Sequence, residues 1–326
     1  MHHPAKAHFY RLLPGFIALA LTSLLLSLLI GSRDITFSQI IGLLINPDNS
    51  LDARILYEVR LPRTLSAFAV GGLLSLAGAL MQVLLRNPLG DPYVLGVSGG
   101  AASAALFGML LGISGWLITP IAFAGALTSI MIVFGLSRFQ TEQQTLLLAG
   151  VVIAAFWGAL ISLTLSLAPP MQLPGMLFWL MGDLSDALQP TVSLFILAIG
   201  LLIAVLLANP LNVAIYGDEQ AHSLGINAQR LRLMLYLITS LLTASAVSIA
   251  GAIGFIGLII PHLIRLLGAS DHRSLLPLCV LAGGSLLVLA DLLARTLIAP
   301  MQIPVGIFTA LLGVPVFIWL LARARG

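Results

Sequence analysis

The sequence predicts an all-α polytopic membrane protein with about ten transmembrane helices per subunit. Of its 326 residues, 59% are hydrophobic and only 8% are charged, whereas a soluble domain carries about 25% charged residues. A water-facing surface made from this chain would lack the polar groups to cover it. Because one span needs about 20 apolar residues, ten spans and their loops use the whole chain. We therefore expect residues 1–326 to form a single transmembrane domain.

The predicted spans are apolar runs that end at charged residues, Pro or Gly. The first run follows Lys6 and Arg11, but it exceeds the length of a signal-peptide core and lacks a small-x-small cleavage site. We expect it to be kept as a span. Only Gly251 separates the seventh span from the eighth. The ten spans are expected at 13–31, 63–85, 93–112, 116–137, 145–167, 190–208, 232–250, 252–268, 274–296 and 304–322.

The basic residues predict which side of the membrane each loop faces. With the N-terminus inside, ten of the fifteen Lys and Arg residues lie on the cytoplasmic side, as the positive-inside rule favours. We therefore expect both termini in the cytoplasm. The formal charge of +3 reflects this bias. Because no basic run carries interleaved aromatic residues, nucleic acid is not an expected partner.

Two polar stretches lie between the predicted spans. The outer segment 168–189 holds three prolines together with Asp183 and Asp186, and no basic residue. The cytoplasmic segment 209–231 is polar and compatible with a helix. A polar stretch this long between two spans is unusual for a compact bundle, so we expect segment 209–231 to meet a partner.

The chain carries a candidate internal repeat. Residues 75–80 read SLAGAL and residues 248–253 read SIAGAI, and in both copies a proline lies ten residues after the glycine. The two copies cross the membrane in opposite directions in the predicted topology. This is the pattern of an inverted repeat, which is common in transporters, with 63–167 and 232–322 as the repeats. Coincidence in a chain rich in Leu, Ala and Gly is the alternative.

Groups that could perform chemistry within the membrane are few. Asp291 is the one clear intramembrane acid, and Arg295 lies four residues later, where the two can pair on one helix face. Cys279 lies in an apolar run and is expected to pack. No histidine falls in an outer loop, so we expect no metal site. The sequence has no GxxxxGK[ST] nucleotide-binding loop, so any ATP-derived energy has to come from a partner.

Four motifs together resemble the permease family of iron-siderophore, haem and cobalamin importers. They are RLPR at 60–63 with the following AVGGLLSLAGALMQ, NPLGDPYVLG at 87–96, GFIGLIIPH at 254–262 followed by DHR, and GIFTALLGVPVFI at 306–318. The resemblance implies a homodimeric permease in the inner membrane, with two ATP-hydrolysing subunits inside and one soluble binding protein outside. ATP and Mg²⁺ would bind to those subunits, and this chain would carry no cofactor.

The resemblance implies a docking role for three arginines at outer span ends, Arg60, Arg63 and Arg295. In the family, arginines at these positions meet acidic residues on the binding protein. A planar guanidinium suits carboxylates, and charge complementarity fixes the register of an encounter. The alternative is anchoring to lipid phosphates or, for Arg295, pairing with Asp291.

The resemblance also implies a coupling helix within segment 209–231, inserted into a cleft on the ATPase. Gly225 would end this helix without steric cost. The alternative is an ordinary polar loop. The predicted coupling residues are Gly217, Asp218, Glu219, Gln220, Ala221, His222, Ser223, Leu224 and Gly225.

A cytoplasmic gate is the third site that the resemblance implies. In the family, the stretch after the second span and the stretch before the fifth close the inner end of the pathway. The second stretch reads EQQT here, which is bulkier than the small hydroxyl residues of the cobalamin importer. The predicted gate residues are Asn87, Pro88, Leu89, Glu142, Gln143, Gln144 and Thr145.

Two other classes of function stay open at this point. An ion-coupled secondary transporter of a small solute could also carry inverted repeats, but it normally shows buried acids as relay groups, and this chain is poor in them. A membrane-embedded enzyme would need paired carboxylates, a Ser with a base or clustered metal ligands. The sequence shows no such constellation, so we do not expect an enzyme. It also does not select one cargo among cobalamin, haem and siderophores.

Overall fold

The computed structural model of this protein describes residues 4–323, apart from 32, 34, 46–47, 49 and 137–142. Over these residues the chain forms helices and no strand. The long or apolar helices are α1 (Pro4–Leu29), α4 (Leu61–Leu84), α5 (Val97–Leu110), α6 (Ile118–Leu136), α7 (Gln143–Leu167), α9 (Pro190–Leu206), α12 (Ala228–Ala250), α13 (Ile256–Leu266), α14 (His272–Thr296) and α15 (Val305–Arg323). The connecting helices are α2 (Phe37–Ile45), α3 (Leu51–Arg54), the π-helix η1 (Ile55–Arg60), η2 (Pro92–Leu95), η3 (Gly115–Leu117), α8 (Leu173–Leu180), α10 (Ala208–Ala214) and α11 (Asp218–Ser223).

The ten predicted spans correspond in order to ten apolar helices. Within the described residues, six helices are long and apolar enough to cross a membrane, and α9 with α10 forms a seventh candidate that bends by 60°. The shorter apolar helices α5, α13 and α15 bring the set to ten. The predicted all-α membrane architecture is confirmed. Two helical runs begin earlier than the predicted spans: α1 begins at Pro4 and not at residue 13, and the run that contains α4 begins at Leu51 and not at residue 63.

Two spans are only partly helical, which corrects the continuous third and eighth spans of the prediction. α5 begins at Val97 after the 3-10 turn η2, and α13 has eleven residues, about 17 Å of helix. Residues 251–255 join α12 to α13 in a non-helical conformation. The hydroxyl of Tyr93 accepts a hydrogen bond from the N–H of Ile253 at 3.0 Å and donates one to its carbonyl at 2.9 Å. A side chain thus satisfies backbone groups that no helix satisfies, as burial in a membrane protein requires.

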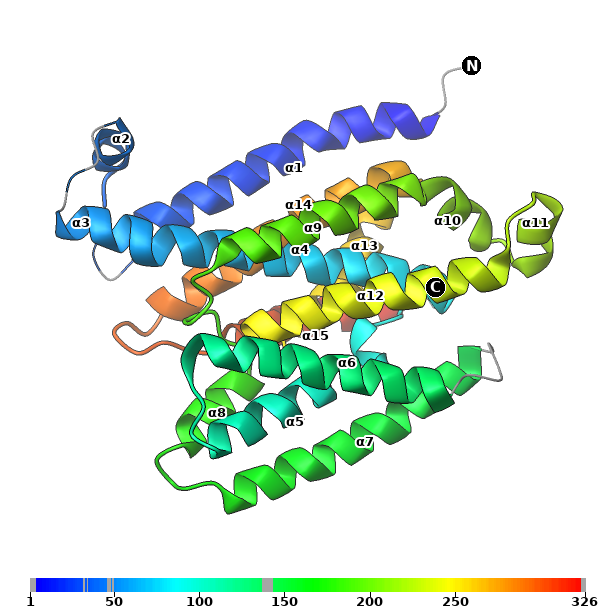
Figure 1. Ribbon diagram of the computed structural model, residues 1–326. Helices are drawn as coiled ribbons and strands as arrows, with labels where there is room; N and C mark the ends of the chain where they lie inside the picture. Colours follow the sequence, from blue (N-terminus) through cyan, green and yellow to red (C-terminus); the bar gives the residue numbers. More distant parts are fainter. Residues whose placement is uncertain are drawn as a thin grey trace.

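α4 lies at the centre of the bundle, where it packs against α14, α12, α13 and α9 (Figure 1). Small residues bring these helices into close contact. A methyl group added to Gly78 would lie 1.9 Å from the carbonyl oxygen of Gly257 on α13. On the α14 side, the hydroxyl of Ser75 donates to the carbonyl of Cys279 at 2.7 Å, and Cys279 is buried as predicted. Close backbone approach of this kind holds helices together in lipid, which offers no hydrophobic drive for association.

Several connecting helices lie at the two ends of the bundle (Figure 1). α2 and α3 lie at one end, which we call the α2 end. The start of α1, α10 and α11 lie at the other, which we call the α11 end (Figure 1). The predicted topology places the N-terminus and segment 209–231 on the same side of the membrane, and it therefore requires the start of α1, α10 and α11 to lie at the same end of the bundle.

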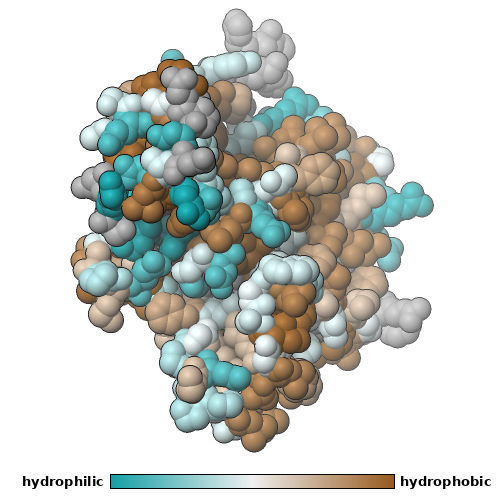
Figure 2. All heavy atoms as spheres, turned by 60° about the vertical axis from the view of Figure 1, so that its left-hand side comes forward, coloured by the Kyte–Doolittle hydropathy of each residue, from teal (hydrophilic) through white to brown (hydrophobic). Residues whose placement is uncertain are grey.

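The α2 end carries a small core of its own and a polar surface. Figure 2 brings this end forward and shows hydrophilic residues gathered on it, whereas hydrophobic residues cover the flank of the bundle. The helices α2, α3 and η1 are held together by a separate apolar cluster. Its buried members are Ile35, Ile40, Leu43, Ala53 and Leu56.

The two copies of the candidate repeat differ in local structure. SLAGAL at 75–80 lies inside the uninterrupted helix α4, whereas SIAGAI at 248–253 contains the end of α12 at Ala250. Gly251 then adopts a positive φ of 67°, which ends the helix. The similarity of the two segments therefore does not extend to their conformation, and the repeat of 63–167 by 232–322 stays a prediction.

Candidate functional site

At the α2 end, Arg63 forms a buried ion pair with Asp291. Arg63 lies in the first turn of α4, and Asp291 lies on α14. The Nη2 atom of Arg63 is 2.8 Å from Oδ1 of Asp291, and its Nε is 3.1 Å from both carboxylate oxygens. The side chains are 9% and 1% exposed. Such a fork against a carboxylate is the strong geometry for an arginine ion pair.

This pairing adds a second partner to the one expected for Asp291. The i,i+4 neighbour Arg295 does lie within ion-pair distance, with its Nε 3.8 Å from Oδ2 of Asp291. The closer partner is Arg63, which is 228 positions away in sequence. Helical spacing predicts only neighbours on the same helix, so the contact between α4 and α14 could not be read from it.

A polar chain continues from Arg63 toward the loop between α8 and α9. Nη1 of Arg63 donates to Oε1 of Gln302 at 3.1 Å. The hydroxyl of Ser185 donates to Oε1 of Gln302 at 3.3 Å, and also contacts Oδ1 of Asp183 at 2.7 Å. The ion pair is therefore linked to two segments that sequence reasoning treated as separate loops.

Arg60 and Arg295 cap the last turn of α1. Nη1 of Arg60 donates to the carbonyls of Leu28 at 2.7 Å and Leu29 at 3.1 Å. Nη2 of Arg295 donates to the carbonyl of Ser27 and, at 2.8 Å, to its hydroxyl. Helix C-terminal carbonyls lack partners within the helix and favour a nearby positive charge. The two arginines therefore fix the end of α1 against α4 and α14.

Within the subunit, two of the three predicted docking arginines, Arg60 and Arg63, are buried by these contacts. Arg60 is 3% exposed and Arg63 is 7% exposed within the subunit, because both guanidinium groups are directed into the bundle. The basic side chains that face outward at the α2 end are Arg33, which pairs with Asp52 at 2.8 Å, and Arg54, which pairs with Glu58 at 3.5 Å. Docking by Arg60, Arg63 and Arg295 stays a prediction.

At the α11 end, the predicted coupling segment forms a short helix. α11 covers Asp218–Ser223 and lies between two glycines with positive φ, Gly217 at 117° and Gly225 at 77°. The predicted helix end at Gly225 is confirmed. Ala221 is buried against the bundle, and the outward face is exposed. Its exposed members are Glu219, Gln220, His222, Ser223 and Leu224.

Asp218 ties α11 to the rest of the α11 end. Its carboxylate pairs with Arg86, which follows α4, and with Nη2 of Arg232 on α12 at 2.5 Å. Asp218 is 42% exposed, so each pair contributes no more than about 1 kcal/mol to stability. The pairs orient α11 more than they stabilise the fold.

The predicted gate residues lie in two places. Asn87, Pro88 and Leu89 are exposed in the turn after α4, where Oδ1 of Asn87 accepts from the N–H of Leu89 at 2.9 Å. Gln143, Gln144 and Thr145 form the first turn of α7, and Glu142 lies outside the described residues. Closure by these two stretches stays a prediction.

Sequence reasoning missed Arg265 and Gln82. Arg265 on α13 donates to Oε1 of Gln82 on α4, and Nε2 of Gln82 donates to the carbonyl of Leu258 at 3.1 Å. The motif around 254–262 ends three residues before Arg265, so only the contact reveals the pair. No group of three His, Cys, Asp or Glu residues that could hold a metal is present among the described residues.

The chain resembles known proteins over nearly its whole length. Residues 19–323 match the FecCD transport family. The vitamin B12 import system permease protein BtuC of Klebsiella pneumoniae is 38% identical, with 99% of this chain and 97% of BtuC covered. The hemin transport system permease protein HmuU of Yersinia pestis is 39% identical, with 97% and 96% covered.

A solved structure shares the fold described above. It is an ABC transporter assigned to the metal-chelate type, in an inward-facing conformation, with a TM-score of 0.85 and 31% sequence identity. The match covers 96% of this chain and 99% of that one. On the family match and these full-length similarities, this protein belongs to the FecCD transport family and is a multi-pass membrane permease of an ATP-binding-cassette importer.

Proposed function

We propose that this chain is the permease subunit of an importer of metal chelates in the inner membrane, with cobalamin, haem and ferric siderophores as the candidate cargo. Two copies form the pathway, and two separate ATP-hydrolysing subunits drive it. A soluble binding protein delivers the chelate. ATP and Mg²⁺ bind to the hydrolysing subunits, so this chain carries no cofactor and no ATPase activity. Both termini and α11 face the cytoplasm, and α2 faces outside.

The observation that carries this proposal is the exposed helix α11. It stands between two glycines, turns a polar face outward and is oriented by Asp218. A helix of six residues is too short to be stable without packing, and Ala221 is the buried residue of α11, so the exposed face suits a partner. The chain has no nucleotide-binding loop of its own, and an ATPase is the partner that supplies the missing energy.

The proposal for the α2 end is a docking face for the binding protein. Arg33 is 57% exposed and Arg54 is 67% exposed, so both can meet acidic residues of a partner by exchanging their ion pairs with Asp52 and Glu58 at the surface. Arg60, Arg63 and Arg295 would have to leave their contacts with α1 and Asp291 to do so. We propose that these three hold the docking face in shape and contact the partner only if α1 moves.

The transport proposal is tested with the complex in proteoliposomes. Uptake of cobalamin, haem and a ferric siderophore is measured with and without ATP, each with its binding protein. We expect ATP-dependent uptake of one class, lost when Asp218→Arg reverses the charge that orients α11. Arg11→Gln, far from α11 in the chain, is the matched control and should transport normally. Uptake by the permease without any ATPase would instead identify a secondary transporter.

The proposed orientation is tested by cysteine labelling in intact cells. The native Cys279 is fully buried, so it gives little background with a membrane-impermeant maleimide. Gln220→Cys on α11 should stay unlabelled until the membrane is opened, and Asp48→Cys at the α2 end should label at once. The reverse pattern would place α11 outside and overturn the proposal.

A further inference from the structure

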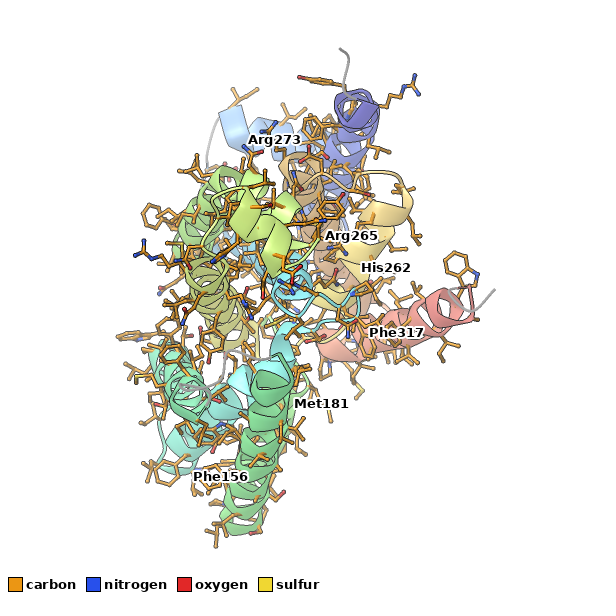
Figure 3. The ribbon with its side chains drawn as sticks, turned by 90° about the vertical axis from the view of Figure 1, so that its right-hand side faces the viewer. Phe156, Met181, His262, Arg265, Arg273 and Phe317 are labelled. Atoms are coloured by element: carbon orange, nitrogen blue, oxygen red, sulfur yellow. The ribbon has the colours of Figure 1, made fainter. Side chains whose placement is uncertain are left out.

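A cavity of about 540 Å³ lies at the α11 end, beside the coupling helix. It is open to the surface and is lined by the end of α4 and the turn after it, by α10, by Arg265 of α13 and by the loop that joins α13 to α14. Figure 3 looks at this end of the molecule and labels Arg265, nearer the middle of the face than Arg273. The polar side chains that line the cavity include Gln82, Arg86, Asn212, Tyr216, Arg265 and Asp271, together with Asn87 of the predicted gate.

Of the two arginines that line this cavity, Arg86 pairs with a carboxylate of the described residues and Arg265 does not. Arg265 donates to the neutral amide of Gln82, and no carboxylate of the described residues lies within 4 Å of it. The two acids nearby have other partners. Asp218 pairs with Arg86 and Arg232. The Oδ1 atom of Asp271 accepts from Nδ2 of Asn212 at 2.8 Å and from the N–H of Arg273 at 2.9 Å.

The Arg265 side chain is held in place before any partner arrives. Gln82 donates to the carbonyl of Leu258 at 3.1 Å while its Oε1 accepts from Arg265. Gln82 is buried, so its amide has little freedom. A partly buried cation without a counter-charge is unfavourable, and a pre-positioned guanidinium binds a carboxylate with little loss of conformational freedom.

The position of the cavity indicates where the counter-charge comes from. Arg86 lines the cavity and also pairs with Asp218 of α11. Tyr216 is 74% exposed and directly precedes Gly217, at the start of the coupling segment. A protein seated on α11 therefore lies beside the cavity. The space of about 540 Å³ exceeds that of a single small ion and leaves room for an acidic side chain.

We propose that this cavity is a second contact site for the ATP-hydrolysing subunit, which inserts an acidic side chain against Arg265. The inference rests on the proposed function, since it presumes that such a subunit binds α11. Binding at two adjacent points, α11 and the cavity, would fix the angle between the subunits, because one short helix alone allows rotation. It also gives Arg265 the carboxylate that the isolated permease lacks.

The first test measures the affinity of the purified permease for its ATPase at several salt concentrations. Arg265→Gln should weaken binding at least tenfold and flatten the salt dependence, because a charge contact between the two proteins is lost. Arg265→Lys should recover part of the affinity. Arg273→Gln removes an exposed arginine from the same end and should stay within twofold of wild type. An unchanged affinity for Arg265→Gln would overturn the inference.

The second test separates this role from a structural one. Because Arg265 has no counter-charge within the permease, Arg265→Gln should leave the Tm of the isolated permease unchanged or raise it. A lower Tm together with normal ATPase affinity would show that Arg265 only supports the fold. Loss of a bound anionic phospholipid in native mass spectrometry, with affinity unchanged, would assign the cavity to lipid. A wild-type permease that binds no ATPase would refute the proposed function itself.

Discussion

At the α2 end, Arg63 lies against the carboxylate of Asp291, whereas at the α11 end Arg265 lies against the amide of Gln82. Both arginines belong to α4 or to its neighbour α13, and both are largely screened from solvent. The first is neutralised within the subunit, and the second is not. An arginine near the end of a span can therefore serve the fold or a partner, and the distinction depends on which acid packs beside it.

The largest expected effect is at Asp291. Asp291→Asn leaves the Arg63 and Arg295 guanidinium groups buried without a carboxylate. Breaking a buried ion pair by removing one partner costs about 3–5 kcal/mol. We expect a loss of this size in the free energy of unfolding, measured by denaturant titration in detergent.

The control for Asp291 replaces both charges. Arg63→Met with Asp291→Leu removes the pair without leaving an isolated charge, and such replacements are often close to neutral. The double variant should therefore be more stable than Asp291→Asn alone. A double variant less stable than Asp291→Asn would mean that the ion pair stabilises the fold by more than the neutralisation of its two charges. The contrast between a neutralised Arg63 and an unneutralised Arg265 would then not explain the roles of the two arginines.

The next effect is expected where α13 meets α4, since this contact positions Arg265. Gly78→Ala would place a methyl group 1.9 Å from the carbonyl oxygen of Gly257. Overpacking of this kind costs about 1–3 kcal/mol, and the shift of α13 should also weaken binding of the ATPase. Gly135→Ala on α6 is the matched control, because nothing lies within 4 Å of the added methyl group. Equal Tm values for the two variants would show that α13 can move away freely.

The sequence predicted the features that depend on neighbours along the chain. The ten spans follow from runs of apolar residues, and the end of α11 follows from Gly225. The interruptions in the third and eighth spans could not be predicted in this way, because the hydropathy of a residue is the same in a helix and in an extended segment. Residues 251–255 are apolar in sequence, like the helices on either side, but they are not helical. Only the hydrogen bonds between the Tyr93 hydroxyl and Ile253 show how the backbone groups of this segment are satisfied.

The candidate sites follow the same division. α11 was predicted as a short helix from its own residues and their resemblance to a family segment. The environment of Arg60, Arg63 and Arg295 was not predicted. The carbonyls that accept from Arg60 lie 27 to 32 positions away, and the partners of Arg63 lie 228 and 239 positions away. Spacing along one helix cannot report on helices that meet only after packing. Arg265 was missed for this reason as well.

The smallest expected effect concerns Asp271, the acid of the cavity that does not neutralise Arg265. Burial alone would raise its pKa, but the backbone N–H of Arg273, the amide of Asn212 and the nearby charges of Arg273 and His272 outweigh burial and lower the pKa below 3.8. A lowered pKa in the folded state stabilises the protein above the unfolded value, and this contribution is lost as the pH falls through the folded value. Asp271 is also the N-cap of α14.

Asp271→Asn tests this assignment, because Asn caps a helix as well as Asp does. At neutral pH we expect a loss of only about 0.3–1 kcal/mol, the contribution of a negative charge at a helix N-terminus. Below pH 4 the stability of wild type should fall toward that of the variant, so the two Tm curves converge. Arg273→Gln keeps the hydrogen bonds of Asp271 but removes one favourable charge, so the folded pKa is lowered less and convergence should be complete at a higher pH. A constant gap between wild type and Asp271→Asn down to pH 3 would mean that Asp271 stabilises α14 without its charge. The acid would then be free to lie near Arg265, and the contrast between the two ends of the bundle would weaken.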